Sequence, residues 1–183
     1  MRTSYSLGSL LSINEILDCS RILQSKNPDT VWIPETWGME NFSMLSMISQ
    51  NVQSKIGSSI INIYSRSPAL IAMGAVTVDT ISNGRLIIGL GTSSPAIVED
   101  FHGYNFEKPL SRMREYVGLV RKITTGEKIT HDGEFFHLKG FSLLTKPVRS
   151  KIPIYLAAVN KKMVELAWEI SDGVIFYLRP LNE

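Results

Sequence analysis

The sequence has little of what marks exported or membrane-spanning chains. Its single cysteine, Cys19, has no partner for an intramolecular disulfide, so we expect a cytoplasmic protein of a reducing compartment. Cys19 falls on a predicted amphipathic helix, where a buried and inert thiol is the ordinary expectation. No run of about 18 apolar residues and no charged-then-apolar leader occurs. These absences argue against export and against membrane spanning.

Patterns that mark other classes of function are missing too. The formal net charge is only +2, and no tract of basic residues interleaved with aromatics is present, so we expect no nucleic-acid partner. The densest basic segment, 146–151, is predicted to be a solvated loop, with phosphate binding as the alternative. His102, His131 and His137 fit no H-E-x-x-H spacing, and no G-x-S-x-G elbow occurs. The sequence therefore predicts no metal site and gives no support to hydrolase chemistry.

What the sequence does contain is a regular alternation of strand-like and helix-like segments. A Ser12-x-x-Glu15 capping box, Ser67 before Pro68, and Gly84 after an apolar helix mark helix ends. The continuously apolar segment after Arg85 is typical of a strand buried in a parallel sheet. Strands are predicted at 3–7, 30–34, 56–61, 85–90, 153–158 and 173–177, and helices at 12–25, 42–51, 68–81, 110–124 and 161–170.

Six strands joined by helices favour an α/β fold of the TIM (β/α)8 type, present as about six βα units. An open doubly wound sheet is less favoured because no G-x-G-x-x-G follows the first strand. An Asp132-Gly133 turn predicts a small hairpin insertion near 129–140. We therefore expect one barrel domain over 1–183, corresponding to the amino-terminal portion of a barrel. A fragment, a split product and a shortened barrel completed by association remain alternatives.

Five segments resemble the luciferase-like monooxygenase superfamily. They are VWIPETWG at 31–38, the long stretch SRSPALIAMGAVTVDTISNGRLIIGLGTSSPAIVEDFHG at 65–103, FEKPLSRMREYV at 106–117, HDGEFFHL at 131–138 and IPIYLAA at 152–158. The resemblance is strongest to the branch of oxidoreductases that use coenzyme F420, including those similar to methylenetetrahydromethanopterin reductase. It implies a (β/α)8 barrel that transfers a hydride between F420 and a small organic substrate. FMN is the alternative cofactor, in a luciferase-like monooxygenase.

The resemblance also implies where the cofactor lies, at the carboxyl ends of the strands. A bulge with a non-prolyl cis peptide is implied at Ser59-Ile60, against the middle ring. The start of the helix at Lys161 is the candidate phosphate site, because free amides there favour an anion. The implied cofactor-binding residues are Ser58, Ser59, Ile60, Asn62, Gly91, Thr92, Ser93, Ala157, Ala158 and Asn160.

Glu35, Thr36 and Trp37 are the candidate catalytic residues, because they follow the second predicted strand. Relatives often carry an Asp-His pair here, and Thr36 departs from that pattern, so imidazole catalysis is not carried over. Glu35 would hold or relay a proton if buried; pairing with a cation or capping a loop is the alternative. Trp37 would stack on substrate or ring, or fill the core.

Two further expectations concern assembly. The resemblance implies a homodimer formed through early helices, for which Met39, Met44, Leu45 and Met47 offer an apolar face; packing on the barrel is the alternative. A noncatalytic flavin-binding or assembly subunit is the rival to an enzyme. The expected partners are a small-molecule substrate and a second copy of the chain, and no nucleic acid and no membrane are expected.

Overall fold

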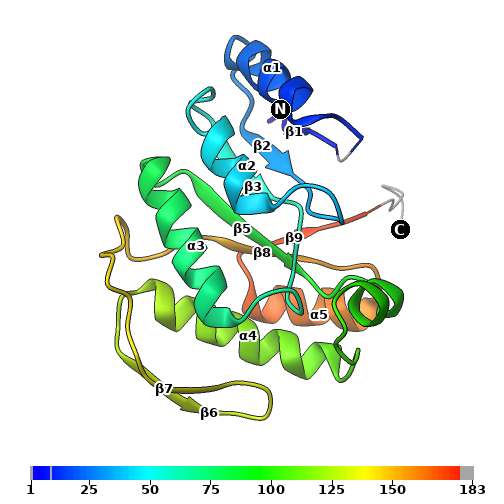
Figure 1. Cartoon of the computed structure of the whole chain (residues 1–183), viewed down its shortest axis with the longest axis vertical. Coiled ribbons are helices and arrows are strands. Elements are labelled where there is room, and N and C mark those ends of the chain that lie inside the picture. The colour runs from blue at the N-terminus through cyan, green and yellow to red at the C-terminus, as the bar shows by residue number, and fades with distance from the viewer. Residues whose placement is uncertain (1, 9, 178–183) are drawn as a thin grey trace.

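The computed structural model describes residues 2–8 and 10–177, and its centre is a single parallel sheet (Figure 1). The strand order is β1-β2-β3-β5-β8-β9, with β4 also paired to β5. The order along the sheet follows the order along the chain, as it does in a (β/α) barrel. Within the described residues, β1 and β9 are the two edges of the sheet. The strands are β1 (Tyr5–Ser6), β2 (Thr30–Ile33), β3 (Lys55–Ser58), β4 (Ile61–Asn62), β5 (Leu86–Gly91), β8 (Ile154–Ala157) and β9 (Gly173–Ile175).

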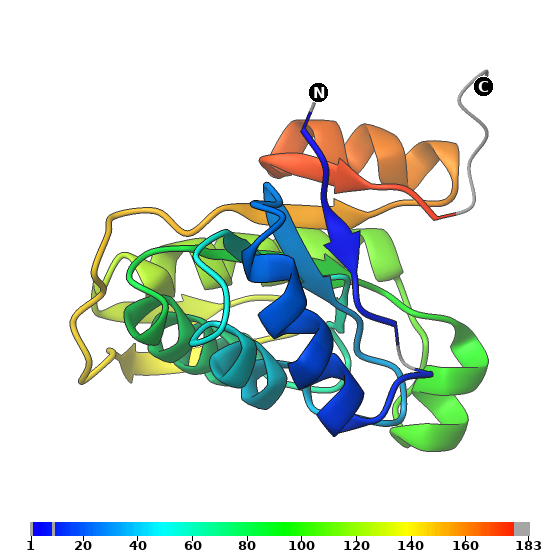
Figure 2. The same ribbon diagram turned by 90° about the horizontal axis from the view of Figure 1, so that it is seen from above.

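Every predicted helix is present. Consecutive helices contact one another from α1 to α5, so that α1 lies at one end of the row and α4 and α5 at the other (Figure 1). Seen from above, α1 and α2 lie next to each other (Figure 2). The helices are α1 (Ile13–Gln24), α2 (Asn41–Ile48), α3 (Pro68–Ile81), α4 (Pro109–Thr124) and α5 (Lys161–Ile170), and a short π-helix, η1 (Ile97–Phe101), lies in the connection after β5, which was expected to be a loop.

The helix ends confirm the capping signals of the sequence. Ser12 and Glu15 form the reciprocal capping box of α1, with the Ser12 amide donating to Glu15 at 2.7 Å. Ser67 caps α3 by accepting from the amide of Leu70, and Pro68 opens the helix. Because these bonds satisfy amides that have no partner inside the helix, they fix where each helix begins.

The third predicted strand, 56–61, is divided into β3 and β4. The pairing with β5 shifts by one residue between Gly57 and Ile61, so the strand carries a bulge. The peptide bond between Ser59 and Ile60 in this bulge is cis, which confirms the implied position. The prediction of one continuous strand over 56–61 was therefore wrong at residues 59 and 60, which lie between β3 and β4.

The predicted hairpin is formed by β6 (Ile129–Asp132) and β7 (His137–Phe141), which pair antiparallel and lie apart from the main sheet (Figure 1). Its connection, 133–136, is longer than the Asp132-Gly133 turn alone. Glu115 of α4 accepts hydrogen bonds from two amides of this connection, those of Phe135 and Phe136, at 3.1 and 2.9 Å. The side chain of His131 also contacts Glu115, at 3.0 Å. The connection is thus held against α4.

Apolar side chains from the strands and helices form one large cluster of buried residues, with a smaller one beneath the hairpin. Cys19 packs on the edge of the large cluster and is partly buried. In residues 2–8 and 10–177, no helix is both long and apolar enough to cross a bilayer.

Candidate active site

Two hollows lie at the carboxyl ends of the strands, the edge at which barrel folds place their ligands. One has a volume of about 890 Å³ and lies between the ends of β4, β5 and β8 and the start of α5. The other, of about 800 Å³, lies between the ends of β2, β8 and β9. Both volumes fall in the range of small-molecule and cofactor sites. Ile60, Ala157, Val159 and Tyr177 line both hollows, so the two form adjoining compartments of one site.

The structure brings most of the predicted site residues to these hollows. The larger hollow is lined by Gly91, Thr92, Ser93 and Asn160, the smaller one by Glu35, Thr36, Ser59 and Ala158, and both by Ile60 and Ala157. They come from loops far apart in the sequence, which meet because the strands that precede them are parallel neighbours.

Ser58, Asn62 and Trp37 do not line either hollow. The Ser58 hydroxyl is buried and bonds both the carbonyl and the amide of Gly89, at 2.9 and 2.6 Å, so it ties β3 to β5. The Asn62 side-chain oxygen, Oδ1, accepts from the Tyr64 amide at 2.9 Å. Trp37 is 72% exposed and contacts the ring edge of Phe101, so it is not a core aromatic. Whether these three residues touch a ligand stays a prediction.

Polar atoms without partners lie beside the bulge. The Ser59 hydroxyl and the Asn62 side-chain nitrogen are both buried, and neither has a hydrogen-bond partner among the described residues. Buried polar groups almost always have a hydrogen-bond partner, and a group left without one lowers the unfolding free energy by about 1–3 kcal/mol. Because Ser59 lines the smaller hollow, this end of the sheet fits a ligand that brings its own donors and acceptors.

Gly91 keeps the wall between the hollows thin. A Cβ atom added to Gly91 would lie 2.6 Å from Cδ1 of Ile60 and 3.3 Å from Cβ of Ala157. Ile60 therefore lies directly against the backbone of β5, which only glycine permits. Ser93, two residues on, has a φ of 59°, a conformation that turns the backbone sharply at the rim of the larger hollow. Close packing at this point puts apolar side chains beside the polar loop.

Glu35 is held in an ion pair. Its carboxylate receives two hydrogen bonds from Arg66, at 2.6 and 2.8 Å, and a third from the amide of Asn41 at 2.9 Å. Both side chains are largely buried, with 11% and 13% exposed. Of the two alternatives for Glu35, the structure supports pairing with a cation. No pattern in the sequence pointed to Arg66 as its partner, although Arg66 lies within the SRSPA block.

The start of α5 forms one wall of the larger hollow. Asn160 caps the helix, its side-chain oxygen accepting from the amide of Met163 at 3.0 Å. Lys161 and Lys162 line the same wall, and Lys161 is mostly exposed. A helix start flanked by two cations favours a negatively charged group.

Aromatic residues that the sequence did not single out line the smaller hollow. Trp32 and Tyr155 face each other with ring centroids 5.9 Å apart, and Phe176 and Tyr177 follow the end of β9. Trp32 stands between the buried Val31 and Ile33, and side chains alternate along a strand. That alternation would have placed Trp32 on the opposite face of the sheet from these two.

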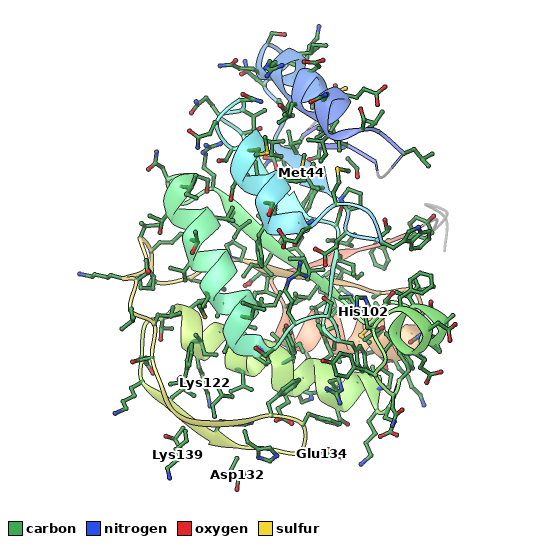
Figure 3. All side chains as sticks on the ribbon, in the orientation of Figure 1. Met44, His102, Lys122, Asp132, Glu134 and Lys139 are labelled. Atoms are coloured by element: carbon green, nitrogen blue, oxygen red, sulfur yellow. The ribbon has the colours of Figure 1, made fainter. Side chains whose placement is uncertain are left out.

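No cluster of three or more potential metal ligands occurs within residues 2–8 and 10–177. His102 lies beside η1, far from Asp132 and Glu134 of the hairpin (Figure 3). The histidine and these acidic residues therefore do not converge.

A curled parallel sheet whose strand order follows the chain, with helices in the connections, is the architecture of a (β/α) barrel. A family model for luciferase-like monooxygenases matches residues 2–183. The chain belongs to this family.

Individual relatives agree with this assignment. The chain is 39% identical over 164 residues to a provisionally named coenzyme F420-dependent oxidoreductase of Mycobacterium tuberculosis, covering 81% of this chain and 47% of that protein. It is 37% identical over 157 residues to the 5,10-methylenetetrahydromethanopterin reductase of Archaeoglobus fulgidus, covering 85% of this chain and 46% of that protein. The chain thus spans about half the length of these curated relatives.

The fold is shared with a solved structure, the coenzyme F420-dependent tetrahydromethanopterin reductase of Methanopyrus kandleri. The two superpose with a TM-score of 0.86 at 22% identity, over 96% of this chain and 55% of that one. The likeness confirms the (β/α) barrel architecture expected from the sequence.

Proposed function

We propose that this chain supplies the cofactor site of an F420-dependent oxidoreductase that transfers a hydride between F420 and a small organic substrate. The observation that carries the proposal is the divided hollow, whose two compartments share Ile60 and Ala157. Such an arrangement lets a ring system and a substrate lie against each other. The names of the two sequence relatives favour F420 as the cofactor.

The residues of the larger hollow would hold the cofactor. F420, when bound, supplies the ring carbon that accepts or gives up the hydride. Ile60 and Gly91 provide an apolar wall for a ring, and Thr92 and Ser93 place hydroxyls and amides at the rim. The unpaired Ser59 hydroxyl and Asn62 amide nitrogen offer hydrogen bonds beside the same wall. The start of α5, with Lys161 and Lys162, would bind the phosphate.

The smaller hollow would take the substrate. Trp32 and Tyr155 form an apolar surface there, and the Thr36 hydroxyl lies at its rim. The rings exclude water from the reacting atoms, which strengthens the electrostatic interactions inside the site. Glu35 has both carboxylate oxygens engaged by Arg66, so its role would be structural support of this wall rather than proton transfer.

An FMN-dependent monooxygenase is the second candidate, favoured by the description of the matching family model. Titration of the purified protein with oxidised and reduced F420, and separately with FMN, distinguishes the two through quenching of cofactor fluorescence. We expect F420 to bind and Thr92→Val to weaken binding, whereas Thr145→Val, an exposed loop change, leaves it unchanged. Tight binding of FMN alone would support the monooxygenase. Binding of neither would refute both candidates and favour a noncatalytic assembly subunit.

A homodimer remains a prediction. Met44 and Leu45 of α2 are buried in the core of the chain itself, while Met47 is 46% exposed. Only part of the expected apolar face is therefore available to a second copy. Sedimentation of the purified protein, with Met47→Lys as the variant, tests whether α2 lies in an interface.

A further inference from the structure

Arg66 connects its own loop, after β4, to the loop after β2 and to α4. Its guanidinium donates to Glu35, just past β2, and also to Glu40 at 2.6 Å, the residue that caps α2. The same group lies over the ring of Phe42, with 5.8 Å to the centroid. The backbone carbonyl of Arg66 accepts from the Tyr116 hydroxyl at 2.9 Å. A single residue therefore joins the loop after β4 to the loop after β2 and to α4.

These bonds differ from those of an ordinary surface ion pair. Burial by itself would lower the pKa of Arg66, yet the bonds to Glu35 and Glu40 outweigh burial, so the pKa is raised. Burial also raises the pKa of Tyr116, which is held neutral as the donor to the Arg66 carbonyl. Two parallel hydrogen bonds to one carboxylate fix the direction of both side chains.

The segment fixed in this way forms part of the site. Glu35 and Thr36 line the smaller hollow together with Ser59 and Ile60. The loop that carries Arg66 begins directly after Asn62, at the end of the bulged strand. Through its bonds to Glu35, Arg66 therefore links the segment that carries Glu35 and Thr36 to the segment that follows Ile60.

We propose that Arg66 is a positioning residue, which holds the Glu35-Thr36 wall at the distance from Ile60 that ligand binding requires. The inference rests on the proposed function, because it assigns the wall to the site of F420 and its substrate. It gives Glu35 a fixed cationic partner and makes the pair, rather than either residue alone, the functional unit.

Two other Arg–carboxylate pairs in the chain serve as matched controls. Arg149 pairs with the buried Asp79, at 2.9 and 2.7 Å, beside the amino end of β5 and away from the hollows. Arg114 pairs with Glu169 on the exposed faces of α4 and α5. All three pairs have two parallel bonds, but only that of Arg66 borders the site.

The test compares Arg66→Gln, Arg149→Gln and Arg114→Gln by F420 titration and thermal unfolding. We expect Arg66→Gln to raise the Kd for F420 by about tenfold or more, since a small displacement of a site wall is costly. Arg149→Gln should lower the Tm and leave the Kd within about twofold, because distant sites act independently. Arg114→Gln should change neither. Arg66→Lys keeps the charge but not the paired bonds, so it should not restore binding.

A second measurement needs no ligand and separates this inference from the proposed function. Amide hydrogen exchange over residues 34–42 should become about tenfold faster in Arg66→Gln than in the unaltered protein, and not in Arg149→Gln. Glu35→Gln should give the same acceleration from the other partner, which covers the case in which Arg66→Gln does not fold. Unchanged exchange in both variants, or equal losses of F420 affinity in Arg66→Gln and Arg149→Gln, would overturn the inference. If the unaltered protein binds no F420, the proposed function fails, and the exchange result still decides the role of Arg66.

Discussion

Replacing Gly91 by alanine tests the thin wall between the two hollows. The new Cβ would lie 2.6 and 2.8 Å from Cδ1 and Cγ1 of Ile60, well inside van der Waals contact. Ile60 must therefore rotate into a hollow or push β5 aside. Overpacking of this kind costs about 1–3 kcal/mol of unfolding free energy, and the smaller entropy of the unfolded chain returns about 0.4–1 kcal/mol. We expect a net loss of about 1–2 kcal/mol.

The effect on ligand binding should exceed the effect on stability, because the displaced Ile60 side chain occupies space that both hollows share. F420 titration measures the effect on binding, and urea unfolding measures the effect on stability. In the double variant Gly91→Ala/Ile60→Ala, the two carbons that the new Cβ would contact are gone. The loss of unfolding free energy should therefore be smaller than the sum of the losses in the two single variants, by about 1 kcal/mol.

A control for the substitution itself is Gly118→Ala, in the exposed middle of α4, where an added Cβ meets nothing within 4 Å. This change should stabilise the protein by about 0.5–1 kcal/mol. A tight contact between Gly91 and Ile60 is refuted if Gly91→Ala stabilises the protein as Gly118→Ala does, or if the effects of Gly91→Ala and Ile60→Ala on the unfolding free energy are simply additive.

Two further predictions concern the supports of the site. Burial acts to raise the pKa of Glu115, but the bonds from His131 and from the amides of Phe135 and Phe136 outweigh it and lower the pKa. The stabilisation of the hairpin by Glu115 should thus be complete above a pH of about 4.5 and lost as the pH falls further. Protection factors of the hairpin amides, which correct for the pH dependence of intrinsic exchange, should fall in this range, and Glu115→Gln should remove that fall. Ser58→Ala leaves the Gly89 amide without its bond and should lower the unfolding free energy by about 1–3 kcal/mol in urea unfolding, whereas a loss below about 0.5 kcal/mol would mean that the strands close without the hydroxyl.

Signals that act over a few residues were sufficient to predict the helices. The Ser12 and Ser67 caps bond amides three residues away, so their geometry is encoded locally. The order of the strands followed from the regular alternation of elements. The position of the cis peptide at Ser59-Ile60 came from the resemblance alone, since no local pattern distinguishes it from an ordinary strand.

The sequence could not give the contacts that depend on the tertiary fold. Arg66 and Glu35 are separated by 31 residues, and only the parallel pairing of β2 with β3, which the chain continues into β4, brings them together. Ser58 and Ser59 are adjacent and identical, yet Ser58 bonds Gly89 while Ser59 lines the smaller hollow. The bulge decides which serine faces which way, and a one-residue shift exchanges their roles.

Ile60 and Ala157 each line both hollows, and this sharing has a consequence for ligand binding. A molecule in the larger hollow and a molecule in the smaller one would share these two wall residues, so a shift of either side chain on filling one hollow alters the surface that the other offers. The two binding equilibria are therefore linked, and linkage is reciprocal: whatever factor one ligand imposes on the affinity of the second, the second imposes on the first. Cofactor and substrate would then report on each other in any titration.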